Sequence, residues 1–127
     1  MTSTLTFDDR GLADSLASAS ADQIDQLDFG VIGFDADTIV RIYNAFESQA
    51  AGLSPQRVIG EPLFTNVAPC LNNFLVAQRF EDAAADASEL DDTIDYVLTL
   101  RMRPIKVKLR LLAGAAGGTR YVLVQRR

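Results

Sequence analysis

The segment from Lys106 to Leu111 alternates between charged and apolar side chains at every position. This alternation is typical of an antiparallel strand that buries one face and exposes the other. The segment therefore predicts a sheet whose apolar face must be covered by other parts of the chain.

Four further segments are predicted to be strands because they are rich in β-branched and large apolar residues. Residues 29–35 and 38–43 form a hairpin around the short turn Asp35-Ala36-Asp37. Residues 93–101 and 120–125 precede and follow the alternating strand. The sheet therefore has five strands, two from the first part of the chain and three from the last.

Helices are expected mainly between the hairpin and residue 93. Asn44 begins a short helix as a capping residue, and Ser54-Pro55 begins a second helix that Gly60 ends. Residues 61–73 are expected to be irregular. Residues 74–87 are expected to form a longer helix, with an apolar stripe of Phe74, Ala77, Phe80 and Ala84. This order of elements predicts an α+β domain, a five-stranded antiparallel sheet with its helices on one face.

Residues 1–28 form an acidic segment that precedes this sheet and carries six aspartates and one arginine. Leu12 and Leu16 recur at helical spacing, with Asp8 or Asp9 as the expected cap, and a second turn is expected over residues 21–27. A segment with so few apolar anchors should be among the less stable parts of the fold. A chain of 127 residues predicts a single domain, made of an N-terminal cap (1–28) and a core (29–127).

The formal net charge of −5 disfavours binding to nucleic acid, because an acidic surface repels phosphates. Residues 101–110 are a local exception, and we interpret their basic side chains as the solvated face of a strand: Arg101, Arg103, Lys106, Lys108 and Arg110. The first residues do not have the pattern of a signal peptide, and no apolar run approaches membrane-spanning length. We expect a cytoplasmic monomer that does not bind membranes.

Cys70 is the only cysteine, and the chain has no histidine. A cysteine protease needs a base beside its thiol, a structural zinc site needs about four cysteine or histidine ligands, and dithiol redox chemistry needs a second thiol. None of these is available. Cys70 is then either a small buried thiol without a chemical role or the attachment point of a group from outside the chain.

Tyr43 and Glu47 lie four residues apart. If Asn44 opens a helix, both side chains can point in the same direction. A simpler interpretation is that Glu47 completes a capping box with Asn44, and that Tyr43 ends its strand with the hydroxyl in water. Neither residue alone indicates a function.

Three motifs in this frame resemble the photoactive yellow protein family. The similarity extends over nearly the whole chain, from Phe7 to residues 106–108. The motifs are Tyr43-Asn44-Ala45-x-Glu47, Val58-Ile59-Gly60 and Val67-Ala68-Pro69-Cys70.

The resemblance implies a blue-light photoreceptor on a PAS fold, with p-coumaric acid (4-hydroxycinnamic acid) bound to Cys70 as a thioester. It further implies that Tyr43 and Glu47 hydrogen-bond the phenolate oxygen of this chromophore, and that Met102 lies nearby and assists recovery after illumination. Glu47 can donate a hydrogen bond only when it is protonated, which burial in an apolar pocket favours. On this mechanism light isomerises the chromophore, Glu47 loses its proton, and the N-terminal cap loosens as the signal.

The sequence also departs from the family pattern at positions near the expected chromophore. Ala51 stands where a threonine is common, Leu53 where an arginine is frequent, and Leu100 where a tyrosine is found. The last strand has Tyr121-Val122 in place of a tryptophan. The chromophore pocket is therefore expected to be more apolar, with fewer hydrogen bonds.

Two other functions remain open from the sequence. A PAS module without pigment would bind a ligand or another protein, and the departures at Ala51, Leu53 and Leu100 are compatible with it. An enzyme with Cys70 as nucleophile is disfavoured because no histidine is present to activate the thiol. We expect a non-enzymatic sensor with a downstream signalling protein as its partner.

Overall fold

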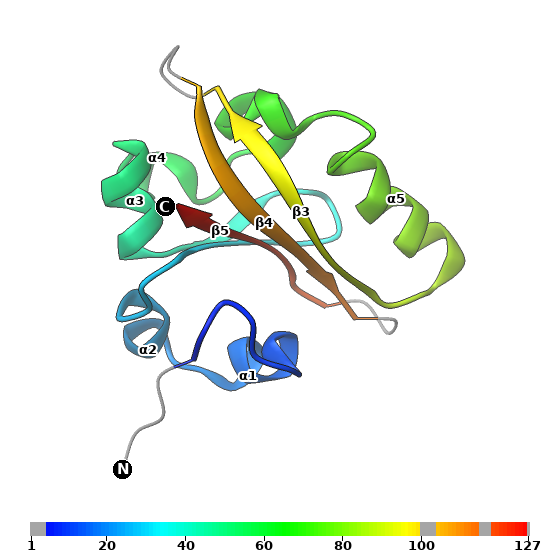
Figure 1. Ribbon diagram of the computed structural model, residues 1–127, viewed down its shortest axis with the longest axis horizontal. Helices are drawn as coiled ribbons and strands as arrows, with labels where there is room; N and C mark the ends of the chain where they lie inside the picture. Colours follow the sequence, from blue (N-terminus) through cyan, green and yellow to red (C-terminus); the bar gives the residue numbers. More distant parts are fainter. Residues whose placement is uncertain (1–4, 100–103, 115–117, 127) are drawn as a thin grey trace.

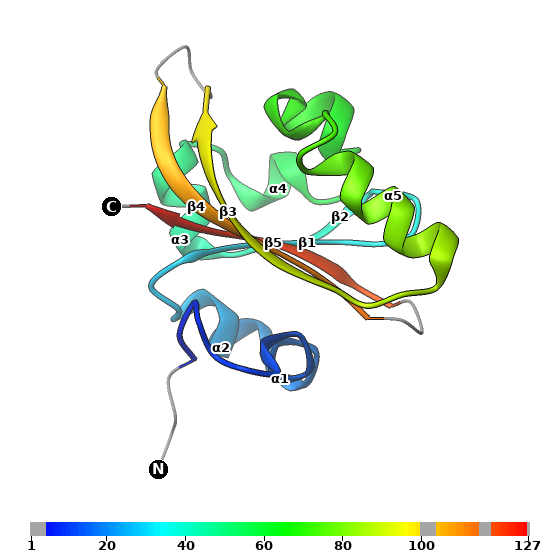
Figure 2. The same cartoon turned by 45° about the vertical axis from the view of Figure 1, so that its right-hand side comes forward.

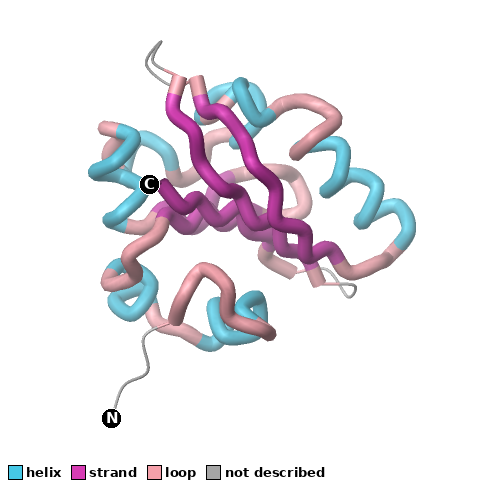
Figure 3. The backbone as a smooth tube through the Cα atoms, in the orientation of Figure 1, coloured by secondary structure: helices cyan, strands magenta, loops and turns pink. Residues whose placement is uncertain are grey.

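The computed structural model describes residues 5–99, 104–114 and 118–126. Five strands form one antiparallel sheet in the order β2-β1-β5-β4-β3 (Figures 1 and 3). The α+β architecture predicted from the sequence is confirmed. The strands are β1 (Gly30–Phe34), β2 (Val40–Tyr43), β3 (Leu90–Leu98), β4 (Ile105–Ala113) and β5 (Arg120–Arg126).

Helices cover both faces of this sheet, the core helices on one face as predicted and the N-terminal cap helices on the other (Figure 2). Figure 2 shows α4 and α5 on one face and α1 and α2 on the other. The helices are α1 (Leu12–Ser18), α2 (Ala21–Asp25), α3 (Ala45–Ala51), α4 (Pro55–Val58) and α5 (Ala77–Asp86). A π-helical turn (Leu63–Val67) and a 3-10 turn (Pro69–Leu71) lie in the segment that the sequence predicted to be irregular.

Because strand side chains alternate between faces, the sheet separates two apolar layers. Ile32, Phe34 and Val122 pack with α4 and α5 in one layer. Val31 and Tyr121 pack with the cap helices in the other layer. Side chains of β1 and β5 that point to opposite faces of the sheet therefore belong to two separate apolar layers.

Several boundaries and burials differ from the sequence-based expectations. Helix α5 begins at Ala77, so Phe74 lies outside it and its side chain is 76% exposed. Neither Asp8 nor Asp9 caps α1: the residue before the helix is Gly11, in the left-handed conformation, and Asp9 instead accepts hydrogen bonds from Thr6. The Asp9 carboxylate thus stabilises the turn that begins at Thr6 and not the start of α1. A capping rule based on sequence position alone cannot distinguish these two uses of an aspartate.

Arg110 corrects the interpretation of the basic segment as a solvated face. Its side chain is buried, whereas Lys106 and Lys108 are exposed as expected. Arg101 and Arg103 lie outside the described residues. Arg110 is buried because the cap covers its strand face, a tertiary contact that the local pattern cannot reveal.

The Arg110 guanidinium fastens the cap to the sheet. Its Nη1 donates to the backbone oxygens of Phe7 (2.8 Å) and Asp9 (2.7 Å), while Nε and Nη2 form a two-point ion pair with Asp91 on β3. The hydrogen bond from Arg110 holds the pKa of Asp91 below its ordinary value. A depressed pKa means that this ion pair stabilises the fold at neutral pH and is lost as the pH falls through that lowered value.

Within the described residues, no helix is both long enough and apolar enough to cross a membrane.

Replacing Arg110 with glutamine should loosen the cap. Hydrogen bonds to a charged donor contribute about 1.5–3 kcal/mol each, so amide exchange in residues 5–28 should accelerate by about tenfold or more. Lys108→Gln is the matched control, because Lys108 lies on the same strand but is half-exposed in a longer ion pair of 3.7 Å. Equal exchange in both variants would show that Arg110 does not hold the cap.

Candidate functional site

Asn44 organises the region around Tyr43 and Glu47. It is the N-cap of α3, as predicted, and its side chain is buried. Its Oδ1 accepts from the backbone nitrogens of Val31 (2.9 Å) and Glu47 (3.1 Å). Its Nδ2 donates to the backbone oxygens of Ile24 and Phe29, both at 3.0 Å. One amide thus joins β1, α3 and the cap with no hydrogen-bonding capacity left over.

Glu47 points from α3 toward the sheet and is 1% exposed. Its side chain does not complete a capping box with Asn44, so that simpler interpretation is wrong. Gly30 on β1 makes room for it: a Cβ at that position would lie 2.1 Å from Glu47 Oε1. Any larger residue at position 30 would displace the carboxyl group.

Arg126 on β5 binds this buried carboxyl group. Nη1 lies 2.7 Å from Glu47 Oε1 and Nη2 lies 3.0 Å from Oε2, a two-point contact that fixes both groups. The Arg126 side chain is 15% exposed. Within the described part of the chain, Arg126 Nε is buried and has no hydrogen-bond partner.

Arg126 is a site residue that the sequence analysis missed, although a signal was present. Val122, Val124 and Arg126 alternate along the last strand, so they share its face toward the core layer of α4 and α5. A charged residue on an otherwise apolar strand face calls for a buried partner. Glu47 is that partner.

Tyr43 ends β2, as the sequence predicted, and is 5% exposed, so nearly all of its side chain is buried. Burial raises the pKa of Tyr43 above its ordinary value, the charge of Glu47 raises it further, and Arg126 opposes the shift. Burial alone would lower the pKa of Arg126, but the hydrogen bond and charge of Glu47 raise it overall. Tyr43 is therefore a neutral hydroxyl donor, and Arg126 is a permanent cation.

Cys70 lies on the 3-10 turn and is a half-buried free thiol. Its backbone oxygen accepts hydrogen bonds from the Tyr96 hydroxyl of β3 and from Asn73 Nδ2 (3.3 Å), which anchor the turn. Cys70 and Leu53 both pack against the apolar layer that contains Tyr43. The fold thus brings Cys70, Leu53 and Tyr43 to one side of the sheet.

The remaining predicted site residues divide into two groups. Ala51 is buried in the last turn of α3, the helix that carries Glu47. Leu100 and Met102 lie outside the described residues. Within the described ranges, no cluster of acidic or cysteine side chains could hold a metal ion.

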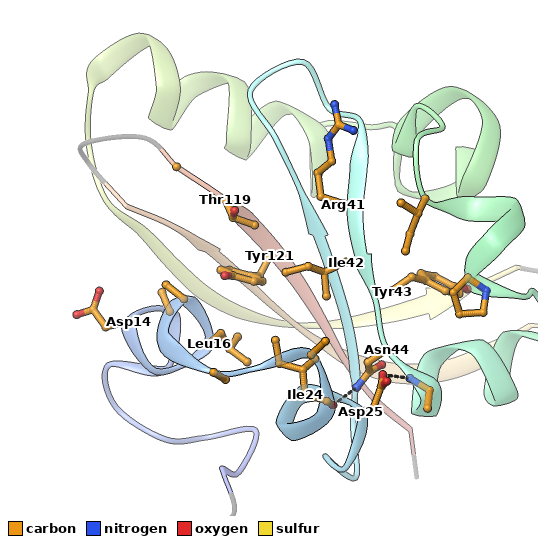
Figure 4. Close-up of a pocket in the computed structure, with 18 of the residues that line it drawn as sticks. Asp14, Leu16, Ile24, Asp25, Arg41, Ile42, Tyr43, Asn44, Thr119 and Tyr121 are labelled. Carbon is orange, nitrogen blue, oxygen red and sulfur yellow. Dashed lines mark hydrogen bonds between the residues drawn. The ribbon is translucent and has the colours of Figure 1, made fainter.

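A pocket of about 670 Å³ lies on the cap side of this region (Figure 4). Leu16 and Ile24 line it from the cap, and Ile42 and Tyr121 line it from the sheet. Asp25 at its edge accepts a hydrogen bond from the backbone nitrogen of Ala45 (2.9 Å). Together with the Asn44 side chain, this bond ties the cap to the beginning of α3.

Comparison with curated proteins finds similar sequences along nearly the full length. The chain is 35% identical over 117 residues to photoactive yellow protein of Rhodothalassium salexigens, covering 89% of this chain and 93% of that protein. It is 34% identical over 115 residues to photoactive yellow protein of Halochromatium salexigens, covering 91% of each. No protein-family model matches the chain.

Comparison with solved structures also finds a photoactive yellow protein domain, together with more distant PAS domains. The photoactive yellow protein domain of the sensor histidine kinase Ppr from Rhodospirillum centenum has a TM-score of 0.81 at 30% identity, covering 89% of this chain and 98% of that domain. The PAS domain of the RpfR quorum-sensing receptor from Cronobacter turicensis, in complex with BDSF, has a TM-score of 0.61 at 14% identity. The second match covers 80% of this chain and 95% of that one and shows the PAS fold alone.

Replacing Arg126 with methionine should destabilise the protein strongly. The change leaves Glu47 as a buried carboxyl group without its cation, and breaking such a pair costs about 3 kcal/mol or more of unfolding free energy. The double variant Arg126→Met with Glu47→Gln should recover most of this loss, because a neutral amide needs no counter-charge. Urea unfolding of the wild type, Arg126→Met, Glu47→Gln and the double variant measures the coupling between the two residues, and additive losses of unfolding free energy would contradict it.

Proposed function

The chain belongs to the photoactive yellow protein family, and on that basis we propose that it is a blue-light photoreceptor carrying p-coumaric acid as a thioester on Cys70. The observation that carries the proposal is the placement of a free, half-buried thiol and of Tyr43 against one apolar layer, with Glu47 buried close by. The chromophore supplies absorption of visible light and photoisomerisation of its double bond. No enzymatic turnover is involved.

The residues present suit a pigment of this chemistry. Cys70 is the single nucleophile that a thioester requires, and its turn is anchored by Tyr96. Tyr43 keeps its hydroxyl proton and can donate to a phenolate oxygen. Leu53 and Ala51 add apolar surface instead of further donors, so Tyr43 and Glu47 carry most of the polar recognition. A buried phenolate needs such donors, because an unpaired buried charge is costly.

Glu47 is the proposed proton donor in the light reaction. In the dark it holds the proton and donates a hydrogen bond to the phenolate oxygen. After illumination the Glu47 carboxyl group would give up its proton to the phenolate oxygen of a bound chromophore. Glu47 would then carry the negative charge, and the total charge of the site would not change.

The cap is proposed to receive this change through Asn44. The Asn44 side chain bonds the backbone nitrogen of Glu47 and also the backbone oxygen of Ile24 in the cap. A displacement at the first turn of α3 therefore acts directly on residues 1–28, which we propose to be a cap on the core of residues 29–127. The loosened cap would be what a downstream signalling protein recognises.

The pigment itself is tested by supplying activated p-coumaric acid to the purified protein. We expect a visible absorption band that bleaches reversibly under blue light and is absent in Cys70→Ser. Mass spectrometry should show the added group on the wild-type protein only. Without a band and with Cys70 unmodified, the PAS module without pigment becomes the better account, and ligand screens would follow.

Illumination should increase amide hydrogen exchange in residues 5–28 more than in the sheet. The physical reason is that the Asn44 and Asp25 side chains link α3 to the cap by only a few hydrogen bonds, each contributing about 1 kcal/mol. The comparison uses the pigmented protein in the dark and in continuous blue light, with Cys70→Ser as the light control. Unchanged protection in the cap would contradict this route of signalling.

A further inference from the structure

Two titratable groups from other elements lie beside Glu47 in the described part of the chain. Arg126 on β5 contacts the carboxyl group directly, and Tyr43 on β2 is close enough for the Glu47 charge to act on it. Glu47 and Tyr43 are in turn the groups that raise the pKa of Arg126. Because Tyr43 stays neutral, Arg126 is the one permanent positive charge that the described residues place at Glu47, and Leu53 adds none where an arginine is frequent in the family.

One cation can balance one buried anion. If Glu47 and a phenolate were both ionised there, two negative charges would share a single guanidinium, and like charges in one site disfavour joint ionisation. If one of them holds the proton, the charges balance. Arg126 also has a donor to spare, because its buried Nε has no hydrogen-bond partner in the described ranges while Nη1 and Nη2 bind Glu47.

We propose that Arg126 is the counter-charge shared by the phenolate in the dark and by Glu47 after light, and that its two-point contact with Glu47 sets the lifetime of the lit state. This role rests on the proposed photoreceptor function. In its effect on the lifetime of the lit state, Arg126 acts through Glu47 and is a positioning residue.

The contact favours the lit state for a geometric reason. Two short, parallel hydrogen bonds from a guanidinium are strongest when both carboxyl oxygens share the negative charge, because the hydroxyl oxygen of a neutral carboxylic acid is a much weaker acceptor. The paired arrangement therefore belongs to the ionised form of Glu47. The side chain has to give up this arrangement to regain its proton, and this slows the return to the dark state.

The first arm of the test uses protein without pigment. At neutral pH, infrared spectra of ¹³C-glutamate-labelled protein should show no protonated carboxyl band in the wild type. In Arg126→Gln a band should appear, and its loss in Arg126→Gln with Glu47→Gln assigns it to Glu47. Arg79→Gln is the matched control, because Arg79 forms an ion pair with Asp92 (2.8 Å) away from Glu47. A spectrum of Arg126→Gln identical to that of Arg79→Gln would overturn the proposal.

The second arm uses pigmented protein and follows the bleached state after a flash. Its lifetime should fall about tenfold in Arg126→Gln and be unchanged in Arg79→Gln. In the Glu47→Gln background, Arg126→Gln should have no further effect. If Arg126→Gln does not fold, Arg126→Lys replaces it: the charge remains but the two-point contact is lost, so the lifetime should still shorten.

The outcomes separate the two proposals. A wild-type protein that takes up no pigment, or does not bleach, refutes the photoreceptor function. A wild-type protein that bleaches normally, with lifetimes in Arg126→Gln and Arg126→Lys equal to that of Arg79→Gln, refutes the role of Arg126 alone. An Arg126 effect that persists in the Glu47→Gln background also refutes it, because the contact with Glu47 would not be its cause.

Discussion

The buried Asn44 amide is the interaction on which the arrangement of the site depends. It spans three elements with four hydrogen bonds, and no other side chain at its position could both cap α3 and bond two backbone oxygens. Its acceptor aligns the first turn of α3 with β1, which directs Glu47 over Gly30. Its donors fix the end of the cap. The same group therefore positions both Glu47, the proposed proton donor, and the segment that is proposed to respond to it.

The geometry set by Asn44 places the Glu47 carboxyl group against the Arg126 guanidinium, and this ion pair determines the electrostatics of the site. A buried carboxyl group facing only apolar residues would stay protonated, as the sequence-based mechanism assumed. A guanidinium on the neighbouring strand gives the ionised form a favourable partner. Arg126 thus lowers the energy of ionised Glu47. On the proposed mechanism, light would then move one negative charge between two groups that share this cation, rather than create an unpaired charge.

The sequence was sufficient for the fold because its strong signals are local. The alternation around Lys108, the Ser54-Pro55 start and the Asn44 cap depend on neighbours within a few residues, and the structure confirms them. The errors fall where distant segments meet. Burial of Arg110 depends on a cap more than 95 residues earlier in the chain, and the partner of Glu47 lies 79 residues away. The alternation of side chains along the last strand indicates that Arg126 faces the core, but it does not identify Glu47 as the partner of Arg126.

The free-energy cost of ionising Glu47 can be compared with the free energy that holds the cap and the core together. An unpaired buried charge costs several kcal/mol, while a small domain is stable by about 5–15 kcal/mol in total. Without Arg126, ionising Glu47 would therefore endanger the whole core. With Arg126 as partner, the free-energy cost of ionising Glu47 falls. It becomes comparable to the free energy of the few hydrogen bonds through which Asn44 and Asp25 join α3 to the cap, each about 1 kcal/mol. On the proposed mechanism the ion pair would thus confine the disturbance to the weakest attachment of the cap and leave the sheet intact, while Arg110 holds the far end of the cap to β4.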